Sequence, residues 1–410
     1  MPEASCLVAA GAGSRRKLAV LALGAVGLAG ALTVAAFAAP ERAARRAATY
    51  VPADERRVLA RVPARDPEEV AARSALAASP DRVEVAVELA RLDLQRYRAL
   101  SDPRYLGRAQ ATLARWWKLP DPPDDVLLLR ATIHQSIHEF AAARADLDRL
   151  VVRSPDAAQA HLTRAVVATV TADYAAARAS CAEVARLTQP LVATTCRAPL
   201  DGLAGHARDA YDQLAGVLAR SRASDPGVRG WALTSLAELA LQLGDLDAAE
   251  RHLRGALALD DGDAYARNLL VDILLDRGDA DAARALLDGR ETIDSHLVRL
   301  AIAAHVAHAP DERRLVGLMR DRIEAAAQRG DRIHLREEAR FALVVEHDAR
   351  RAVALAIDNW AVQKELADAR LLAETAAAAH DQAAAAPVLA WARETGVRDA
   401  WLDRALGGLR

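Results

Sequence analysis

The chain has 410 residues, enough for two or three compact domains or one long repeat array. Hydrophobic residues make up 52% of it but aromatic residues only 4%, and most of the apolar content is Ala, Leu and Val, so helices are favoured over strands and an all-α protein is expected. The formal net charge of −2 excludes a basic field for non-specific binding of nucleic acid.

The first 38 residues have the three parts of a secretory signal peptide. Residues 14–17 read SRRK, an uncharged run follows over residues 18–39, and the small-residue sequence AFA offers cleavage near Ala38. The Arg-Arg pair also resembles a twin-arginine export signal, which leaves the export route open. The run is equally long enough to span a bilayer, so an uncleaved anchor in the inner membrane is the alternative. Both readings place the remainder in the periplasm of a bacterium, whose GC-rich coding the Ala, Arg and Gly bias suggests.

Two stretches of the chain repeat each other 34 residues apart. Residues 243–253 read LGDLDAAERHL, and residues 277–287 read RGDADAARALL. An apolar stripe of helical spacing precedes each stretch. The Gly-Asp pair near the start of each stretch suits a turn and then the N-terminus of a second helix. Each stretch therefore predicts two antiparallel helices, and stacked copies would bury the apolar faces that one pair leaves open.

This helix pair resembles the tetratricopeptide repeat. Weaker copies run from residue 83 to 395, about nine pairs in all. The resemblance implies a right-handed α-solenoid over residues 83–395. Because terminal repeats have one unburied face, a linker and capping helix are expected in 39–82 and a second capping helix in 396–410. The residues that match the family pattern best are Leu236, Ala237, Gly244, Asp245, Ala249 and Ala256.

In this family the first helices of the pairs line a concave groove that binds extended peptides or helices. The resemblance therefore implies a protein or peptide partner. The best segment offers two aromatic residues, an asparagine and three acids; the alternative is that these are solvated side chains without a ligand. Because the clear repeats carry acids there, a receptor for C-terminal carboxylates is not expected. The groove residues implied are Trp231, Thr234, Glu238, Gln242, Tyr265, Asn268, Asp272 and Asp276.

Two cysteines follow the leader. Cys181 falls in the second helix of one predicted pair and Cys196 in the first helix of the next, and these helices should pack together. In an oxidising compartment we expect a disulfide between them. Two buried thiols acting as small apolar groups are the alternative.

Histidines supply the remaining candidate chemistry. His134 and His138 lie four apart on one helix, a spacing that can bind a metal, and His305 and His308 lie three apart. His138 stands where the repeat needs its turn residue, so structural roles are expected and no metal or cofactor. Motifs for a nucleophile with its base or for a phosphate-binding loop do not occur.

The expected function is therefore that of an exported scaffold without catalytic activity. It would bind other proteins through its groove, for example in assembling an envelope complex. A structural, membrane-anchored subunit is the alternative of the same kind. A metal-carrying or enzymatic module that uses the histidines is the alternative of a different kind.

Overall fold

The structure is a computed structural model, and it describes residues 67–100, 102–221, 225–329 and 334–408. Within these ranges every regular element is an α-helix. The predicted leader (1–38), the linker after it and the last two residues lie outside the described residues. None of the described helices is long and apolar enough to cross a membrane.

Nine helix pairs follow α2 (Pro67–Ala78) and precede α22 (Ala400–Gly407), and a short helix, α5 (Ala114–Trp117), extends the first pair. The prediction of an all-α solenoid built from helix pairs is confirmed for the described residues. In chain order the pairs are α3 (Val83–Leu100) and α4 (Arg104–Thr112), α6 (Asp124–Ser136) and α7 (Phe140–Arg153), α8 (Ala158–Val170) and α9 (Tyr174–Leu187), α10 (Pro190–Leu203) and α11 (Ala207–Arg220), α12 (Pro226–Gln242) and α13 (Leu246–Leu259), α14 (Ala264–Asp276) and α15 (Ala280–Leu286), α16 (Asp294–Val306) and α17 (Glu312–Arg329), α18 (Leu335–Val344) and α19 (Ala349–Val362), and α20 (Leu366–Ala378) and α21 (Ala386–Thr395).

The turn between the two helices of a pair has a recurring geometry. In the fifth pair Gly244 has a φ of 76°, the amide of Asp245 donates to the carbonyl of Ala240 at 2.8 Å, and the Asp245 side chain accepts from the amide of Ala248. A left-handed residue thus ends the first helix, and an acid caps the second. Each of the pairs from the second to the ninth has one such residue, and the eight are His138, Ala172, Gly205, Gly244, Gly278, His308, His347 and His380.

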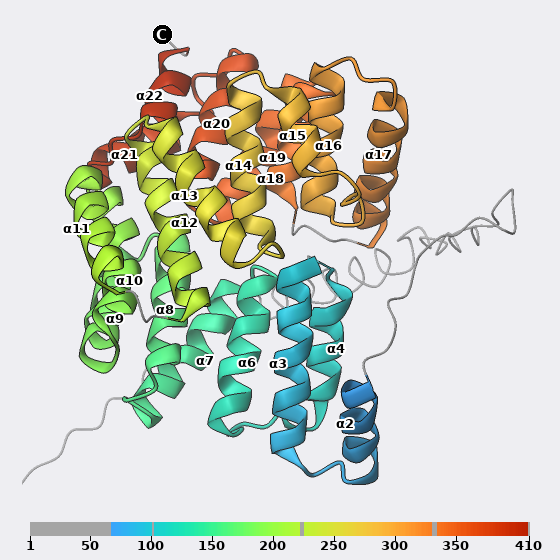
Figure 1. The fold of residues 1–410 in the computed structure, drawn as a ribbon, viewed down its shortest axis with the longest axis vertical. Helices are drawn as coiled ribbons and strands as arrows, with labels where there is room; N and C mark the ends of the chain where they lie inside the picture. The colour runs from blue at the N-terminus through green and yellow to red at the C-terminus, as the bar shows by residue number, and fades with distance from the viewer. Residues whose placement is uncertain (1–66, 101, 222–224, 330–333, 409–410) are drawn as a thin grey trace, which may run out of the picture. The chain divides into compact units, whose positions relative to one another are not determined.

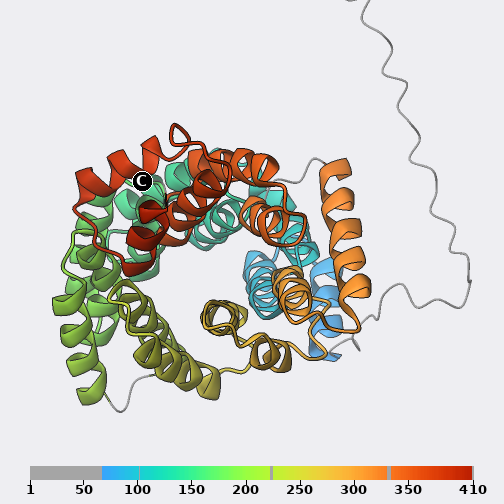
Figure 2. The ribbon, with the colours of Figure 1, turned by 90° about the horizontal axis from the view of Figure 1, so that it is seen from above.

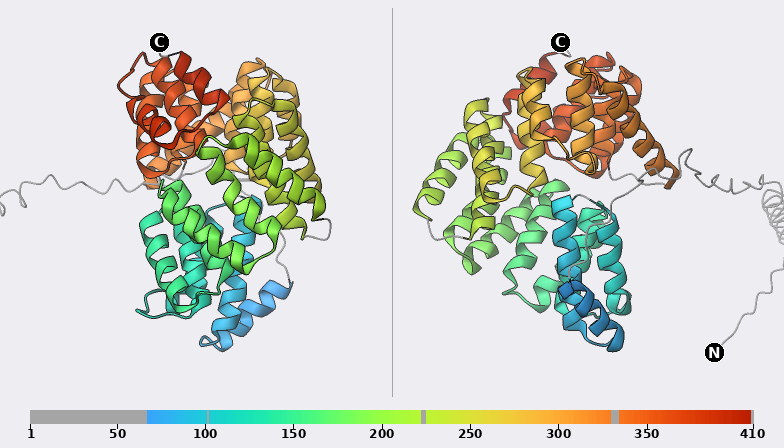
Figure 3. Two further views of the ribbon diagram at one scale, coloured as in Figure 1. Left: turned by 90° about the vertical axis from the view of Figure 1, so that its left-hand side faces the viewer. Right: turned by 45° about the vertical axis from the view of Figure 1, so that its right-hand side comes forward.

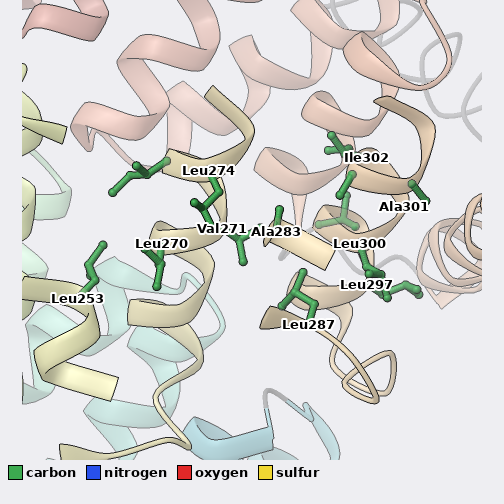
Figure 4. Packing of buried hydrophobic residues seen from close by; sticks show 14 of the residues in the cluster. Leu253, Leu270, Val271, Leu274, Ala283, Leu287, Leu297, Leu300, Ala301 and Ile302 are labelled. Atoms are coloured by element: carbon green, nitrogen blue, oxygen red, sulfur yellow. The ribbon is translucent and has the colours of Figure 1, made fainter. Parts of the chain in front are cut away.

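The core between neighbouring pairs consists of leucines and small residues. Leu253, Leu270 and Leu297 come from three successive pairs and are fully buried in one cluster, which Figure 4 shows from close by. Ala249 and Ala283, also fully buried, leave room for the helices to approach closely. Burying each leucine contributes about 2 kcal/mol, so stacking of the pairs, rather than any pair alone, stabilises the fold.

The pairs wind round so that the end of the chain meets its middle. Within residues 67–408, Figure 1 and the two views of Figure 3 show the first pairs in a lower tier and the last pairs in an upper tier. From above, α12, α14, α16, α18, α20 and α22 surround a common centre (Figure 2). The last helix, α22, contacts α12 as well as α20, so it covers a middle repeat in addition to the end of the solenoid.

Candidate functional site

A cavity of about 280 Å³ lies at this centre. Each repeat helix that contributes to its wall is the first helix of its pair, from α8 to α20, and α22 adds Trp401. The first helices of these pairs therefore face inward. The volume is at the lower end of the range for small-molecule sites, so the cavity suits a side chain or a small molecule better than a long extended peptide.

Five of the eight groove residues expected from the sequence line the cavity: Glu238, Gln242, Tyr265, Asn268 and Asp272. All five lie on α12 and α14, the first helices of the two clearest repeats. Their spacing along one face of each helix brings them together. The Tyr265 ring remains 54% exposed, because it faces open space rather than the packed core.

The other three expected residues do not line the cavity, which corrects the expectation for them. Trp231 is half-buried against the core cluster that contains Cys181, so its ring fills a gap between repeats. The Thr234 hydroxyl is buried and donates to the carbonyl of Gly230 at 3.1 Å. Asp276 is held by an ion pair to Arg370, at 2.9 Å.

Basic residues that the sequence did not predict for this site lie next to the acids of the cavity wall. Arg299 of α16 and Arg340 of α18 both form ion pairs with Asp272, each at 2.8 Å. Burial would raise the pKa of Asp272, but the two guanidinium groups hold it below its ordinary value. The acids of the clear repeats therefore meet arginines that distant degenerate repeats supply to the same space. Arginines at first-helix positions of those repeats were the available signal.

Arg336 and Arg370 complete the basic side of the wall. Arg336 of α18 forms an ion pair with Asp368 at 2.7 Å and another with Glu365. Arg370 of α20 lies over the ring of Trp401, with 3.8 Å from its guanidinium carbon to the ring centroid. These contacts fix the arginine side chains in place.

Glu238 has a different environment from the paired acids. Its carboxylate accepts a hydrogen bond of 2.5 Å from the Tyr265 hydroxyl, and no described basic group forms an ion pair with it. Burial, with a smaller contribution from the charge of Glu365, raises the pKa of Glu238 to about 7, although the Tyr265 hydrogen bond opposes the shift. Its environment therefore disfavours the charged form.

Three buried polar atoms on the cavity wall have no hydrogen-bond partner: Gln242 Oε1, Asn268 Oδ1 and Trp401 Nε1. The three residues are between 6% and 9% exposed. Buried polar groups are nearly always paired, and each unpaired one costs about 1–3 kcal/mol.

The histidines have structural partners. His134 Nδ1 lies 2.6 Å from a carboxylate oxygen of Glu139, and His305 Nδ1 lies 2.7 Å from one of Glu312. His138 and His308 are left-handed turn residues. Among the described residues, no group of three or more His, Cys, Asp or Glu side chains could hold a metal ion.

Cys181 and Cys196 are joined by a disulfide in the structure. Their Cα atoms are 5.7 Å apart, and the bond links α9 of the third pair to α10 of the fourth. Both residues are buried. The bond lies in the core cluster against which Trp231 packs, away from the cavity.

Comparison with known families agrees with this architecture. Two profiles described as tetratricopeptide repeat match residues 128–190 and 240–291. The first segment spans most of the second pair and the third pair, and the second spans the end of α12, α13 and the whole sixth pair. The chain contains tetratricopeptide repeats over these two segments. Repeats of this kind generally mediate protein or peptide binding, so the chain is a protein-interaction scaffold. No curated protein matches its sequence.

Several solved structures are similar over most of the chain. One, a tetratricopeptide repeat protein from Parabacteroides merdae, is 13% identical, with a TM-score of 0.28 over 75% of this chain and 90% of that chain. A human IFIT1 dimer with PPP-AAAA is 12% identical, with a TM-score of 0.40 over 76% and 85%. The P58(IPK) TPR domain is 14% identical, with a TM-score of 0.20 over 76% and 92%.

Proposed function

We propose that this tetratricopeptide-repeat protein is an exported scaffold that holds a partner protein at its inner surface. The central cavity receives one side chain or a short segment of that partner, and the scaffold serves the assembly of an envelope complex. The cavity carries this proposal, since first helices of seven pairs build its wall and three polar atoms of the wall lack partners. A wall of this kind is typical of a binding site rather than of a packed core.

Site-specific photo-crosslinking in the native host tests the proposal. A benzophenone side chain replaces Tyr265, which faces the cavity, and in a matched control it replaces Val152, an 82% exposed residue of α7. We expect a discrete partner protein to be crosslinked from position 265 and not from position 152. Crosslinks from position 152 alone, the same products from both positions, or no product from position 265 would contradict it.

Export is proposed from the SRRK flank, the apolar run and the small-residue site before Ala38. The intact mass of the protein from its native host tests this, measured with and without reductant. A mass that lacks residues 1–38 is expected and would direct the search for partners to soluble periplasmic proteins. A full-length mass would instead favour a membrane-anchored subunit. A gain of two hydrogens on reduction would accompany the Cys181–Cys196 bond.

A further inference from the structure

The charged side chains of the cavity wall are not balanced. Five cations and six carboxylates line the cavity. With every group ionised, the wall therefore carries one negative charge in excess. The five cations are Arg299, Arg336, Arg340, Lys364 and Arg370, and the six acids are Glu238, Asp272, Glu337, Glu365, Glu374 and Asp399.

Four of the six acids are neutralised or capped directly. Asp272, Glu365 and Glu374 form ion pairs with arginines of the wall. Asp399 accepts hydrogen bonds from the amides of Trp401 and Leu402, at 3.0 and 2.6 Å. These acids have no need of a further cation.

Glu337 and Glu238 are the two remaining acids, and only one of them lacks nearby positive charge. Burial would raise the pKa of Glu337, but the charges of His334, Arg299 and Arg336 lower it. Glu238 has the Tyr265 hydroxyl as its partner and Glu365 as a charged neighbour. The excess negative charge therefore belongs to the corner of the cavity at Glu238.

Unpaired acceptors adjoin the same two helices. Asn268 is 9% exposed, and its Nδ2 donates to the hydroxyl of Ser295 at 3.0 Å while its Oδ1 has no donor. Gln242, one turn beyond Glu238 on α12, is 6% exposed; its Oε1 also lacks a donor, but this atom lies against Gly202 of α10. A ligand that donates a hydrogen bond would satisfy Asn268 Oδ1, which the protein leaves unpaired.

We propose that the cavity binds an organic ammonium or guanidinium cation, with Glu238 as its counter-ion and the exposed Tyr265 ring beside it. Carboxylate, amide oxygen and aromatic ring are the groups that stabilise such a cation in a partly buried site. An anion is disfavoured, because the lining residues carry one negative charge in excess when all are ionised. This inference rests on the proposed function, since it specifies what the same cavity receives from a partner.

The cation can come from two sources, and calorimetry with the full chain distinguishes them. The probes are a five-residue peptide with a central lysine, the same peptide with that lysine acetylated, a third copy with glutamate in its place, and free n-butylamine. At pH 8 we expect the lysine peptide to bind about ten-fold or more tightly than its acetylated copy. Tighter binding of the peptide than of butylamine indicates a partner side chain, and equal binding indicates a free amine.

Glu238→Gln is the decisive variant, because it removes the charge and keeps the shape. We expect it to weaken binding of the lysine peptide about ten-fold at pH 8. Glu183→Gln on α9, which removes an exposed carboxylate paired with Arg186, is the matched control and should bind like the wild type. Lowering the pH from 8 to 6 should weaken binding to the wild type and leave binding to Glu238→Gln unchanged. The melting temperatures of both variants show that they fold.

Equal binding of the lysine and acetylated peptides, no binding of either, or tighter binding of the glutamate peptide would overturn the inference. The crosslinking experiment separates this failure from failure of the proposed function. If a partner is crosslinked from position 265 but no cation binds, the proposed scaffold function stands and the cation site is rejected. If the cation binds but no partner is crosslinked, the cation site stands and the proposed scaffold function is rejected.

Discussion

The indole Nε1 of Trp391 donates a hydrogen bond of 2.7 Å to the hydroxyl of Tyr174, although the two residues are 217 positions apart. Tyr174 begins α9 of the third pair, and Trp391 lies in α21 of the ninth. The amide of Lys364 donates to the carbonyl of Val170 at 2.8 Å in the same region. These contacts hold the last pair against the third pair, and this closure brings α20 and α22 to the cavity.

Tyr174→Phe should therefore destabilise the protein through one lost hydrogen bond. The substitution keeps the ring but leaves the buried Nε1 of Trp391 without its acceptor, and we expect a loss of about 1–2 kcal/mol in the free energy of unfolding. Urea unfolding followed by far-UV circular dichroism measures it. The control is Val152→Ala, whose side chain is 82% exposed and which should change stability little. Equal effects of the two substitutions would show that the closure adds no stability.

Gly205→Ala should be more harmful than Gly278→Ala. Both glycines are left-handed turn residues, with φ of 85° and 79°. A Cβ atom at Gly205 would lie 2.6 Å from the carbonyl oxygen of Gly396, whereas one at Gly278 would meet nothing within 4 Å. We expect Gly278→Ala to cost about 1–2 kcal/mol from the backbone conformation alone and Gly205→Ala clearly more. Parallel denaturation curves compare them, and equal costs would argue against the close approach of the two turns.

His380→Gly should stabilise the protein. His380 is exposed and has a left-handed φ of 54°, a conformation that costs a non-glycine residue about 1–2 kcal/mol. Glycine relieves this cost at the price of a more flexible unfolded chain, so a net gain of up to about 1 kcal/mol is expected. Ala379→Gly, one residue earlier and right-handed, is the control and should lower the melting temperature. A lower melting temperature for His380→Gly would mean that the imidazole makes a stabilising contact.

The protein should become less stable as the pH is lowered, because His296 is buried in its neutral form. This residue of α16 is 1% exposed, and burial, aided by the charges of Arg267, Arg299 and Arg290, lowers its pKa from 6.5 to about 4. The unfolded chain binds the proton more tightly, so the stability from neutral His296 is complete above pH 6.5 and is lost as the pH falls toward 4. The loss reaches about 3 kcal/mol at most.

Urea unfolding between pH 8 and pH 5 measures this effect in the wild type and in His296→Gln. The variant has no titrating group at this position, so its free energy of unfolding should fall less over the same interval. His380→Gln, which removes an exposed imidazole, is the control and should follow the wild type. Identical pH dependence in all three proteins would assign the acid sensitivity to other groups.

Local structure and repeat architecture could be predicted because they depend on short-range patterns. The Gly244-Asp245 turn, the Ala249 close approach and the apolar stripes before them recur at 34 residues, and each acts within one helix pair. For the same reason, residues 238, 242, 265, 268 and 272 could be assigned to one inner surface. Each lies on a first helix, and helical periodicity determines which side of a helix a residue occupies.

Other features could not be predicted, because they depend on how far the solenoid turns. Arg299, Arg340 and Arg370 belong to degenerate repeats, and no local pattern says that two of them reach Asp272 and the third Asp276. The assignment of Trp231 to the groove failed because the indole packs between repeats instead.

The sequence by itself determined the helix pairs, their number and the inward side of each first helix, since these follow from turn chemistry and periodicity within about 34 residues. Only the tertiary structure decided that the ninth pair contacts the third, that arginines meet the acids of α14, and that Glu238 is left without a cation. Small rotations between successive pairs add up along the solenoid, and their sum, which no single repeat encodes, sets where its ends meet.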